Sequence, residues 1–520
     1  MKFNYNQIIL LLLFFITSNS IAQAPEIQWQ KSLGGTDDEE ATCIQQTSDG
    51  GYIIAGYSAS NNGDVTLNHN FSDDFWIVKL SSIGVIEWQK SLGGSNPEFA
   101  TSIEQTTDGG YIVAGYSYSN DGDVTLNHGN SDYWIVKLSS TGTIVWQKSL
   151  GGTGDDVANS IKQTNDGGYI VAGYSYSNDG DVTGHHGTTS YADCWIVKLT
   201  SAGTITWQKS LGGDEWDKAS SIQQTSDGGY IVAGDSFSTN GNVTGNHGLT
   251  DYWIVKLTST GTIVWQKSFG GLYGEYARSI QQTADGGYIV SGSGDSLDGD
   301  VIGNHGLSDY WIVKISSTGL LEWQKSLGGS KYDICYSIQQ TNDGGYIVAG
   351  DSASTNGDVT GNNGNNDYWI VKLTSTGSIA WQKSLGGSSY DLGRSIKQTT
   401  DGGYIVAGYS YSNDGDVTGN HGLIDYWIVK LSSFLGVNSF INNSTLTLFP
   451  NPANDDISVK LDYFTPSQEI TITDVLGKTI YNQKLEGLTT TINTSSYEKG
   501  IYLFNLINGT EIITKKFIKE

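Results

Sequence analysis

The sequence predicts an all-β fold: a seven-bladed β-propeller closed by its N-terminal strand and followed by a small C-terminal β-sandwich. The pentad Trp-Gln-Lys-Ser-Leu, with Phe in the last place of one copy, recurs seven times at intervals of 58 to 61 residues. The copies begin at Trp29, Trp88, Trp146, Trp207, Trp265, Trp323 and Trp381. Each period holds four short β-forming runs and no helical period, and such four-stranded repeats are typical of propeller blades.

One period, residues 144–199, illustrates the four predicted strands, which we name d, a, b and c in chain order. Strand d is Ile144–Leu150, with Ile144, Trp146 and Leu150 expected on one face because side chains alternate along a strand. Strand a covers 160–164, and Asn165-Asp-Gly-Gly168 forms a tight turn in which glycine permits positive φ. Strands b and c are Tyr169–Ser175 and Asp193–Leu199, joined by a long loop.

The two ends of the repeat array predict how the ring closes. The array begins on a d strand, Ile27–Leu33, and its last c strand is Asp425–Leu431, with no d strand after it. The N-terminal strand is therefore expected to complete the last blade, which leaves no unpaired edge that would invite aggregation. Fourteen of the fifteen tryptophans lie on c and d strands, so we expect them in the core between blades, Trp216 being the exception.

The N-terminus has the features of a secretory leader. Lys2 precedes an apolar run at 8–16, and Ser20 and Ala22 suit cleavage before Gln23. The apolar run is too short to span a bilayer comfortably, so residues 1–22 are predicted to be a signal peptide and the mature chain is expected to have no transmembrane segment. We assign 23–433 to the propeller, 434–445 to a linker and 446–520 to the C-terminal domain.

Charge and cysteine content exclude some function classes. The formal net charge of −26 disfavours nucleic acid as a partner, since a nucleic-acid-binding face is basic. The three cysteines lie singly in different repeats and form no disulfide framework.

The long b–c loops and the d–a links are expected on one face of the ring, where function tends to reside. The loops repeat Gly-Asp-Val-Thr-Gly-Asn-His-Gly, and all seven histidines lie in them, too far apart around the ring to converge on one ion. No cofactor is certain, but loop oxygens suggest calcium in each blade. The candidate ligands are Asp123, Asp181, Asp300, Asp358 and Asp416. The alternative is that these residues cap turns by accepting backbone N–H bonds.

The d–a links differ most between repeats. They carry an acid at the fourth residue after each Gly-Gly pair, and aromatic residues vary around it. The candidate ligand-binding residues are Trp216, Phe99, Tyr273, Tyr276, Tyr332 and Tyr390. Exposed aromatic side chains on a polar rim suit a glycan or a surface protein; neutral drift is the alternative.

The sequence contains few features that indicate a catalytic site. No nucleophile elbow with plausible partners occurs, and seven equivalent carboxylates suggest a structural role. We therefore expect a non-enzymatic binding protein, with a polysaccharide-active secreted enzyme or a calcium-stiffened spacer as alternatives.

The tail carries four motifs: Phe449-Pro-Asn-Pro-Ala453, Asp474-Val-Leu-Gly-Lys478, Gly500-Ile-Tyr-Leu503 and Lys515-Lys-Phe-Ile518. These motifs resemble the type A C-terminal sorting domain of the bacterial type IX secretion system. The resemblance implies that the secretion machinery is a partner and that the protein is secreted or held on the outer cell surface. It assigns the sorting signal to Pro450, Asn451, Pro452, Asp474, Gly477, Lys478, Gly500, Tyr502, Lys515 and Lys516. The repeats are loosely similar to quinoprotein propellers in fold only, since the adjacent cysteines of that class are absent.

Overall fold

We describe a computed structural model of the chain over residues 23–69, 72–433, 446–461, 468–474, 477–485, 487–508 and 511–520. The chain divides into two compact units, whose described parts are 23–433 and 446–520. The predicted signal peptide and linker lie outside the described residues. Within the described parts, no helix has the length and apolar character needed to cross a membrane.

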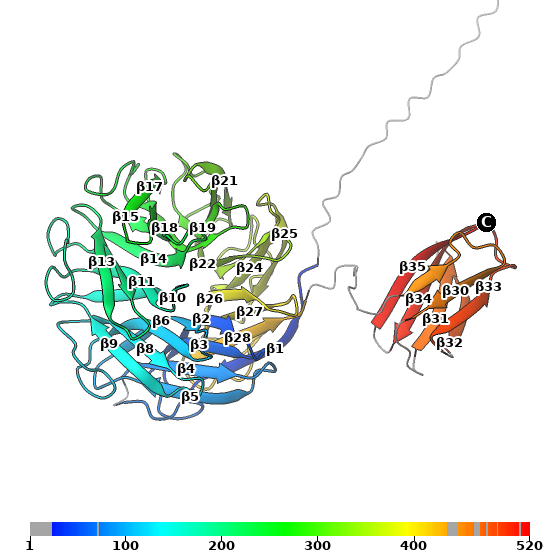
Figure 1. The fold of residues 1–520 in the computed structure, drawn as a ribbon, viewed down its shortest axis with the longest axis horizontal. Coiled ribbons are helices and arrows are strands. Elements are labelled where there is room, and N and C mark those ends of the chain that lie inside the picture. Colours follow the sequence, from blue (N-terminus) through cyan, green and yellow to red (C-terminus); the bar gives the residue numbers. More distant parts are fainter. Residues whose placement is uncertain are drawn as a thin grey trace, which may run out of the picture. The chain divides into compact units, whose positions relative to one another are not determined.

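The first unit contains seven four-stranded antiparallel sheets (Figure 1), the blades of the predicted propeller. Blade 1 is β2 (Glu39–Gln46), β3 (Tyr52–Ser58), β4 (Asp74–Leu80) and β5 (Ile86–Leu92); blade 2 is β6 (Glu98–Gln105), β7 (Tyr111–Ser117), β8 (Asp132–Leu138) and β9 (Ile144–Leu150). Blade 3 is β10 (Asp156–Gln163), β11 (Tyr169–Ser175), β12 (Asp193–Leu199) and β13 (Ile205–Leu211); blade 4 is β14 (Asp217–Gln224), β15 (Tyr230–Ser236), β16 (Asp251–Leu257) and β17 (Ile263–Phe269). Blade 5 is β18 (Glu275–Gln282), β19 (Tyr288–Gly294), β20 (Asp309–Ile315) and β21 (Leu321–Leu327); blade 6 is β22 (Asp333–Gln340), β23 (Tyr346–Ser352), β24 (Asp367–Leu373) and β25 (Ile379–Leu385). Blade 7 is β26 (Asp391–Gln398), β27 (Tyr404–Ser410), β28 (Asp425–Leu431) and β1 (Ile27–Leu33).

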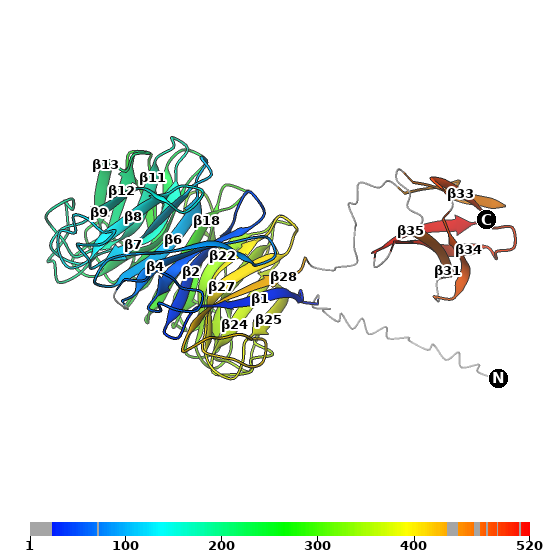
Figure 2. The same cartoon turned by 90° about the horizontal axis from the view of Figure 1, so that it is seen from below.

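The ring closes as the two ends of the repeat array predict. Strand β1 pairs antiparallel with β28, with Trp29 opposite Lys430 and Leu33 opposite Tyr426. Figure 2 shows β1 beside β28, at the point where the two ends of the ring meet. The N-terminal strand therefore supplies the fourth strand of blade 7, and the prediction is confirmed.

Two bulges in each blade change which side chains share a face. In β9 the pairing with β8 skips Val145: Ile144 lies opposite Leu138, and Trp146 lies opposite Lys137. The extra residue reverses the alternation, so Ile144 packs toward blade 1 whereas Trp146 and Leu150 pack toward blade 3. The expectation that all three share a face is wrong for Ile144. A second bulge lies in the first strand of each blade, in β10 between Ala158 and Ser160.

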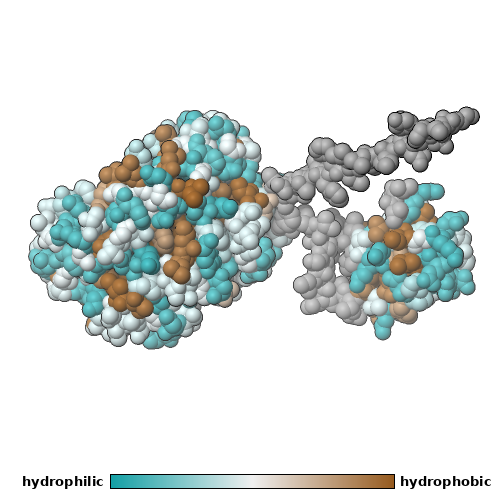
Figure 3. All heavy atoms as spheres, turned by 90° about the horizontal axis from the view of Figure 1, so that it is seen from above, coloured by the Kyte–Doolittle hydropathy of each residue, from teal (hydrophilic) through white to brown (hydrophobic). Residues whose placement is uncertain are grey.

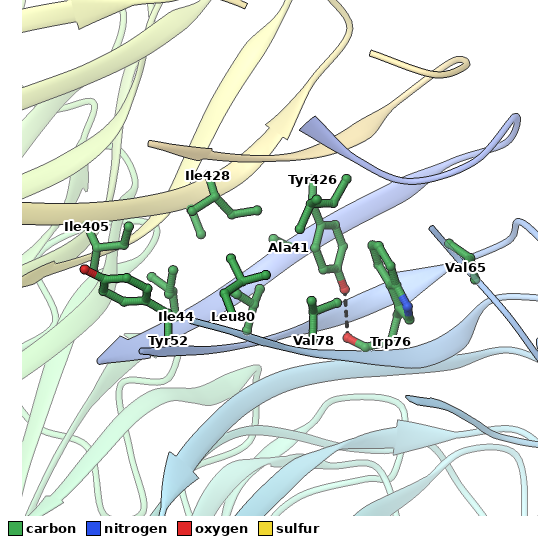
Figure 4. Close-up of a cluster of buried hydrophobic side chains, with 13 residues drawn as sticks. Ala41, Ile44, Tyr52, Val65, Trp76, Val78, Leu80, Ile405, Tyr426 and Ile428 are labelled. Carbon is green, nitrogen blue, oxygen red and sulfur yellow. Dashed lines mark hydrogen bonds between the residues drawn. The ribbon is translucent and has the colours of Figure 1, made fainter. Parts of the chain in front are cut away.

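The apolar core lies between blades and not within them. The cluster in Figure 4 joins Ile405, Tyr426 and Ile428 of blade 7 to side chains of blade 1 such as Trp76. The c-strand tryptophans are fully buried, and each packs on an aromatic or small residue of a neighbouring blade, as Trp76 does on Tyr426 at 4.5 Å between ring centroids. The d-strand tryptophans are mostly half-buried and meet a tyrosine of the next blade edge-on, as Trp29 meets Tyr52. The predicted inter-blade role of these residues is confirmed.

The second unit contains seven short strands in two sheets. They are β29 (Thr447–Phe449), β30 (Asp456–Lys460), β31 (Gln468–Asp474), β32 (Thr479–Lys484), β33 (Thr489–Asn493), β34 (Gly500–Asn508) and β35 (Glu511–Lys519). The sheet orders are β29-β30-β33 and β32-β31-β34-β35, and both sheets contribute to one apolar core around Phe504 and Phe517. This is the predicted small sandwich.

Candidate functional site

The two faces of the ring differ in their connections. The first strand of a blade, such as β2, runs from its d–a link at Glu39 to the Asp-Gly-Gly turn that follows Gln46. The d–a links and the long b–c loops therefore lie at one end of these strands, on what we call the long-loop face. Figure 3 shows one side of each unit, where separate apolar patches lie among hydrophilic and intermediate residues.

The recurrent acid of the d–a links is buried and not part of the rim. Glu39 opens β2 with no exposed surface; its carboxylate accepts hydrogen bonds from the Gly35 amide at 2.7 Å and the Ser58 hydroxyl at 2.7 Å. Burial raises the pKa of Glu39 to about 7, although these hydrogen bonds oppose the shift. The equivalent residues in the other blades are Glu98, Asp156, Asp217, Glu275, Asp333 and Asp391, all equally buried. These acids brace the link between blades.

The loop histidines form a second brace. In six blades a histidine ring contacts the aspartate that opens the c strand, as in the pair His128 Nδ1 and Asp132 Oδ2 at 2.5 Å. The backbone amide of each of these histidines donates to the same aspartate, and in blade 6 the amide of Asn363 donates in the same way to Asp367 without a ring contact. The histidines thus hold the b–c loops against the blade edge, one in each of these blades.

The five candidate calcium ligands lie singly in five different b–c loops. Each carboxylate accepts the amide of the first glycine of its d–a link, as Asp123 does from Gly93 at 3.3 Å. In blade 4, Asn242 accepts the same bond from Gly212 at 3.2 Å. The uncharged Asn242 side chain caps the turn as the aspartates do. This favours turn capping over calcium binding as the role of these residues. Among the described residues no group of three or more His, Cys, Asp or Glu side chains is arranged to hold a metal ion; calcium stays a prediction.

Four of the six candidate ligand-binding aromatics are exposed in the d–a links. Trp216 is 37% exposed, Tyr273 and Tyr332 are 53% exposed, and Tyr390 is 47% exposed. Trp216 has its own aromatic setting: its ring meets Tyr191 edge-on at 4.8 Å and Phe237 at 5.6 Å. These contacts come from the b–c loop of blade 3 and from the residue that follows β15, so the indole packs against two aromatic rings.

The other two aromatics do not lie on the rim. Phe99 is in β6 and Tyr276 in β18, and both are half-buried. Phe99 packs between Tyr57 at 4.8 Å and Tyr116 at 5.1 Å. The expectation that Phe99 and Tyr276 are exposed link residues is wrong, because the first strand of each blade begins earlier than the sequence pattern indicates.

A cavity of about 250 Å³ lies where the seven first strands converge toward the long-loop face. Each blade contributes one residue from the same strand position: Thr42, Thr101, Asn159, Ser220, Arg278, Tyr336 and Arg394. Blades 1 to 4 supply short polar side chains, and three of these bind the next blade, as the Thr42 hydroxyl donates to the Ala100 carbonyl at 2.8 Å. Blades 5 to 7 supply long ones. We call this cavity the axial mouth.

Arg394 is fixed within the axial mouth. Its guanidinium carbon lies 3.9 Å from the centre of the Tyr336 ring, and Nη2 donates to the Tyr409 hydroxyl at 2.7 Å. Nη1 is shielded from solvent and has no hydrogen-bond partner among the described residues; Asp351 Oδ1 is 3.8 Å away. Burial disfavours the cation, but Tyr336, Tyr409 and Asp351 outweigh burial and raise the pKa of Arg394. The guanidinium therefore stays charged.

A second cavity, of about 420 Å³, lies further along the same strands and is enclosed by all seven blades. Serine, glutamine and isoleucine residues line it, together with Cys43, Lys162 and Lys397. Most of the glutamines accept amide protons from the next blade, as Gln45 does from Gln105 at 2.8 Å. Burial and the neighbouring Lys162 lower the pKa of Lys397.

Sequence reasoning missed the axial mouth because the repeats look uniform. A signal was available in the composition: Arg278 and Arg394 are the only two arginines in the chain, and both occupy the same place in their repeats, before Ser-Ile. The asymmetric part of the ring is therefore indicated by the one repeat position at which the residue type differs between blades, and not by the residues that all repeats share.

Comparison with known proteins addresses the second unit directly. Residues 447–520 match the family described as the secretion system C-terminal sorting domain. The second unit is a sorting domain. The match confirms the type IX sorting tail expected from its motifs, and with it the export of this chain to the cell surface or the medium.

The structure shows how some sorting motifs meet. The side-chain oxygen of Asn451 accepts the Ile518 amide at 3.0 Å, and its nitrogen donates to the Lys516 carbonyl at 3.1 Å. The Pro-Asn-Pro motif thus clamps the terminal strand β35, where Lys515 and Lys516 are exposed. Tyr502 is buried and stacks on Phe517. Asp474, Gly477 and Lys478 form the turn before β32, closed by the Lys478 amide donating to Asp474 Oδ1 at 3.0 Å.

Three further similarities are more distant. A 159-residue stretch is 27% identical to the regulatory protein FlaEY of Caulobacter vibrioides, covering 29% of this chain and 17% of that protein. Among solved structures, PorZ, a surface component of the type-IX secretion system of Porphyromonas gingivalis, is 12% identical with a TM-score of 0.40, over 94% of this chain and 60% of that chain. The Neurospora crassa Pan2 WD40 domain is 10% identical with a TM-score of 0.43, over 78% of this chain and 98% of that chain.

Proposed function

We propose that this exported propeller is a non-enzymatic binding protein that recognises glycan through its long-loop face. The observation that carries the proposal is the set of exposed aromatic side chains in the d–a links, above all Trp216 held between Tyr191 and Phe237. A fixed, partly exposed indole offers an apolar plate on which the C–H face of a sugar ring can stack without loss of side-chain entropy. The surrounding loops supply the amides and hydroxyls that sugar hydroxyls require.

Binding is better supported than catalysis. The recurrent carboxyls whose pKa lies near neutrality, such as Glu39 and Glu98, have no exposed surface. A general acid or base has to reach its substrate within hydrogen-bond distance, and these groups face the glycines of their own links. Their geometry supports a structural role for the carboxyls and leaves the face to recognition.

The experiment is a glycan array with the full mature chain, followed by calorimetric titration of the best ligand against Trp216→Ala. Loss of one stacking contact should weaken binding about three- to tenfold. Leu320→Ala is the matched control, because Leu320 is also exposed but lies at a c–d turn on the other face. Unchanged affinity in Trp216→Ala, or equal loss in the control, would overturn the proposal; capture of a surface protein with no glycan bound would replace glycan by protein as the partner.

A further inference from the structure

Four positive charges of this acidic chain lie near the axis of the ring. The formal net charge is −26, yet both arginines line the axial mouth, and Lys162 and Lys397 line the larger cavity beyond it. No Asp or Glu lines either cavity. The strands that surround the ring axis therefore present these four cations to the two cavities.

The arginines are placed for recognition and not only for stability. Arg278 is exposed and forms no ion pair or hydrogen bond with the described residues; its guanidinium lies 5.9 Å from the centre of the Tyr276 ring. Arg394 is held by Tyr336 and Tyr409, and its Nη1 forms no hydrogen bond but lies 3.8 Å from Asp351 Oδ1. Arg278 therefore presents a charged group without a partner at the axial mouth, where an anionic oxygen would accept charge-assisted hydrogen bonds from it.

Two buried carboxylates lie near the arginines but do not line the axial mouth. Asp351 Oδ2 accepts the Asn366 side chain at 2.7 Å, and its Oδ1 lies 3.8 Å from Arg394 Nη1. Asp235 is buried near Arg278 and Lys218. Burial raises the pKa of both carboxyls, to about 6 for Asp351.

The size and shape of the axial mouth limit the kinds of ligand that can fit into it. Short side chains from blades 1 to 4 leave space opposite the Arg278, Tyr336 and Arg394 side chains of blades 5 to 7. At about 250 Å³ the cavity is smaller than most sites for whole small-molecule ligands, roughly 300–1,000 Å³, so it suits one unit of a longer chain.

We infer that the axial mouth binds the carboxylate of an acidic sugar, with Arg394 and Arg278 as the carboxylate-binding residues. This inference rests on the proposed glycan function and names its ligand class. Paired guanidinium groups hold a carboxylate by charge-assisted hydrogen bonds, and the rim aromatics such as Trp216 would contact the neutral part of the glycan.

The test is calorimetric titration of the full mature chain with uronate-bearing oligosaccharides (trigalacturonate and alginate trimers) and with neutral trigalactose. The acidic trimer should bind at least about tenfold more tightly, and this preference should shrink at high salt. Arg278→Gln should reduce affinity for the acidic trimer about tenfold or more and leave neutral binding unchanged. Arg278 is exposed, so this variant is expected to fold; Arg394→Gln, checked by thermal melting, should show the same loss of preference.

The matched control is Lys331→Gln, which removes one exposed charge from a d–a link on the same face. Equal loss in Lys331→Gln would replace a specific site by diffuse attraction and overturn the inference. Equal affinity for acidic and neutral trimers, with binding still lost in Trp216→Ala, would also overturn it while leaving the glycan function intact. Absence of binding to any glycan would overturn both.

Discussion

At the scale of single residues, contacts between blades depend on which side chain occupies the second position of each c strand. Five blades have tyrosine there, and its hydroxyl donates to the carbonyl of a c-strand tryptophan in a neighbouring blade at 2.9 Å. Figure 4 shows this bond from Tyr426 to Trp76. Blades 1 and 3 have Phe75 and Cys194, which pack at the same place without it.

Tyr426→Phe should therefore lower the free energy of unfolding by about 1 kcal/mol, because the ring packing stays and one buried carbonyl loses its donor. Urea unfolding followed by tryptophan fluorescence measures the change. The chain supplies its own control in Phe75, where a Phe75→Leu change should act only through packing. No change in Tyr426→Phe would mean that water replaces the hydroxyl.

In the sorting domain, Asn451 is the residue on which the terminal strand depends. Asn451→Ala removes both side-chain bonds to β35, so we expect a less stable second unit and less protein outside the cell. Immunoblots of medium and cell fractions measure export. Thr491→Ala, which removes only an exposed hydroxyl contact with Ser458, is the control and should be exported normally.

The position of a side chain in the fold could be predicted from the sequence where all repeats carry the same residue type. It could not be predicted where the repeats differ. The burial of Trp76 and its equivalents followed from their recurrence on the c strand. The roles of Arg278 and Arg394 did not, because only the fold shows that residues 116 positions apart in the sequence line one cavity.

At the scale of elements, strand bounds were predictable wherever apolar residues alternate, and β1, β9, β11 and β12 begin and end where the pattern indicates. The first strand of each blade was predicted too short. Its beginning includes a buried acid and a bulge, so it resembles a loop in the sequence although it is paired in the structure. Because of this error, the sequence analysis assigned Phe99 and Tyr276 to the links, whereas they lie in strands.

Among the strands, deletion of β1 is expected to reduce the stability of the propeller most. Deletion of residues 23–33 should expose the edge of β28 and remove Trp29 and Leu33 from their packing, so the propeller should melt at a lower temperature and aggregate. Differential scanning calorimetry and size-exclusion chromatography measure both effects. A synthetic peptide of residues 23–34 should restore the melting temperature; failure to do so would argue against a completing role for β1.

The b–c loops provide the test for calcium. If the loops bind it, EGTA should lower the melting temperature of the mature chain and added calcium should raise it, because a ligand of the folded state alone stabilises that state. If Asp123 and its equivalents only cap turns, the midpoint should not change. Asp123→Asn separates the two cases, since Asn242 already performs the cap in blade 4.

At the scale of the whole molecule, a buried acid recurs in every blade, so its effect on the pH dependence of stability is repeated around the ring. Burial raises the pKa of Glu39, Glu98, Asp156 and Glu275 to about 7, above the values these groups have in an unfolded chain. Because the pKa of each of these groups is higher in the folded state, its contribution to the free energy of unfolding is complete below about pH 4. That contribution is lost as the pH rises through 7.

A second set of carboxylates acts in the opposite direction. Asp49 bonds to Thr47, Gly51 and buried Lys79; these bonds outweigh burial and lower its pKa to about 2, so its contribution is lost only as the pH falls toward 2. Stability in urea should be highest near pH 4 and decrease as the pH rises from about 5 to 7. Glu39→Gln, which mimics the protonated acid, should reduce that decrease, whereas a midpoint that rises toward pH 8 would contradict the assignment.

The pairing of β1 with β28 also bears on how a cell could distinguish finished from unfinished copies. The ribosome makes the partner of β28 first and β28 itself roughly 390 residues later, so the earliest strand waits for the latest one. A polypeptide that stops before Asp425 leaves β1 without a partner, whereas one that extends past Leu431 can cover it. An unfinished ring therefore differs from a finished one by a free β edge.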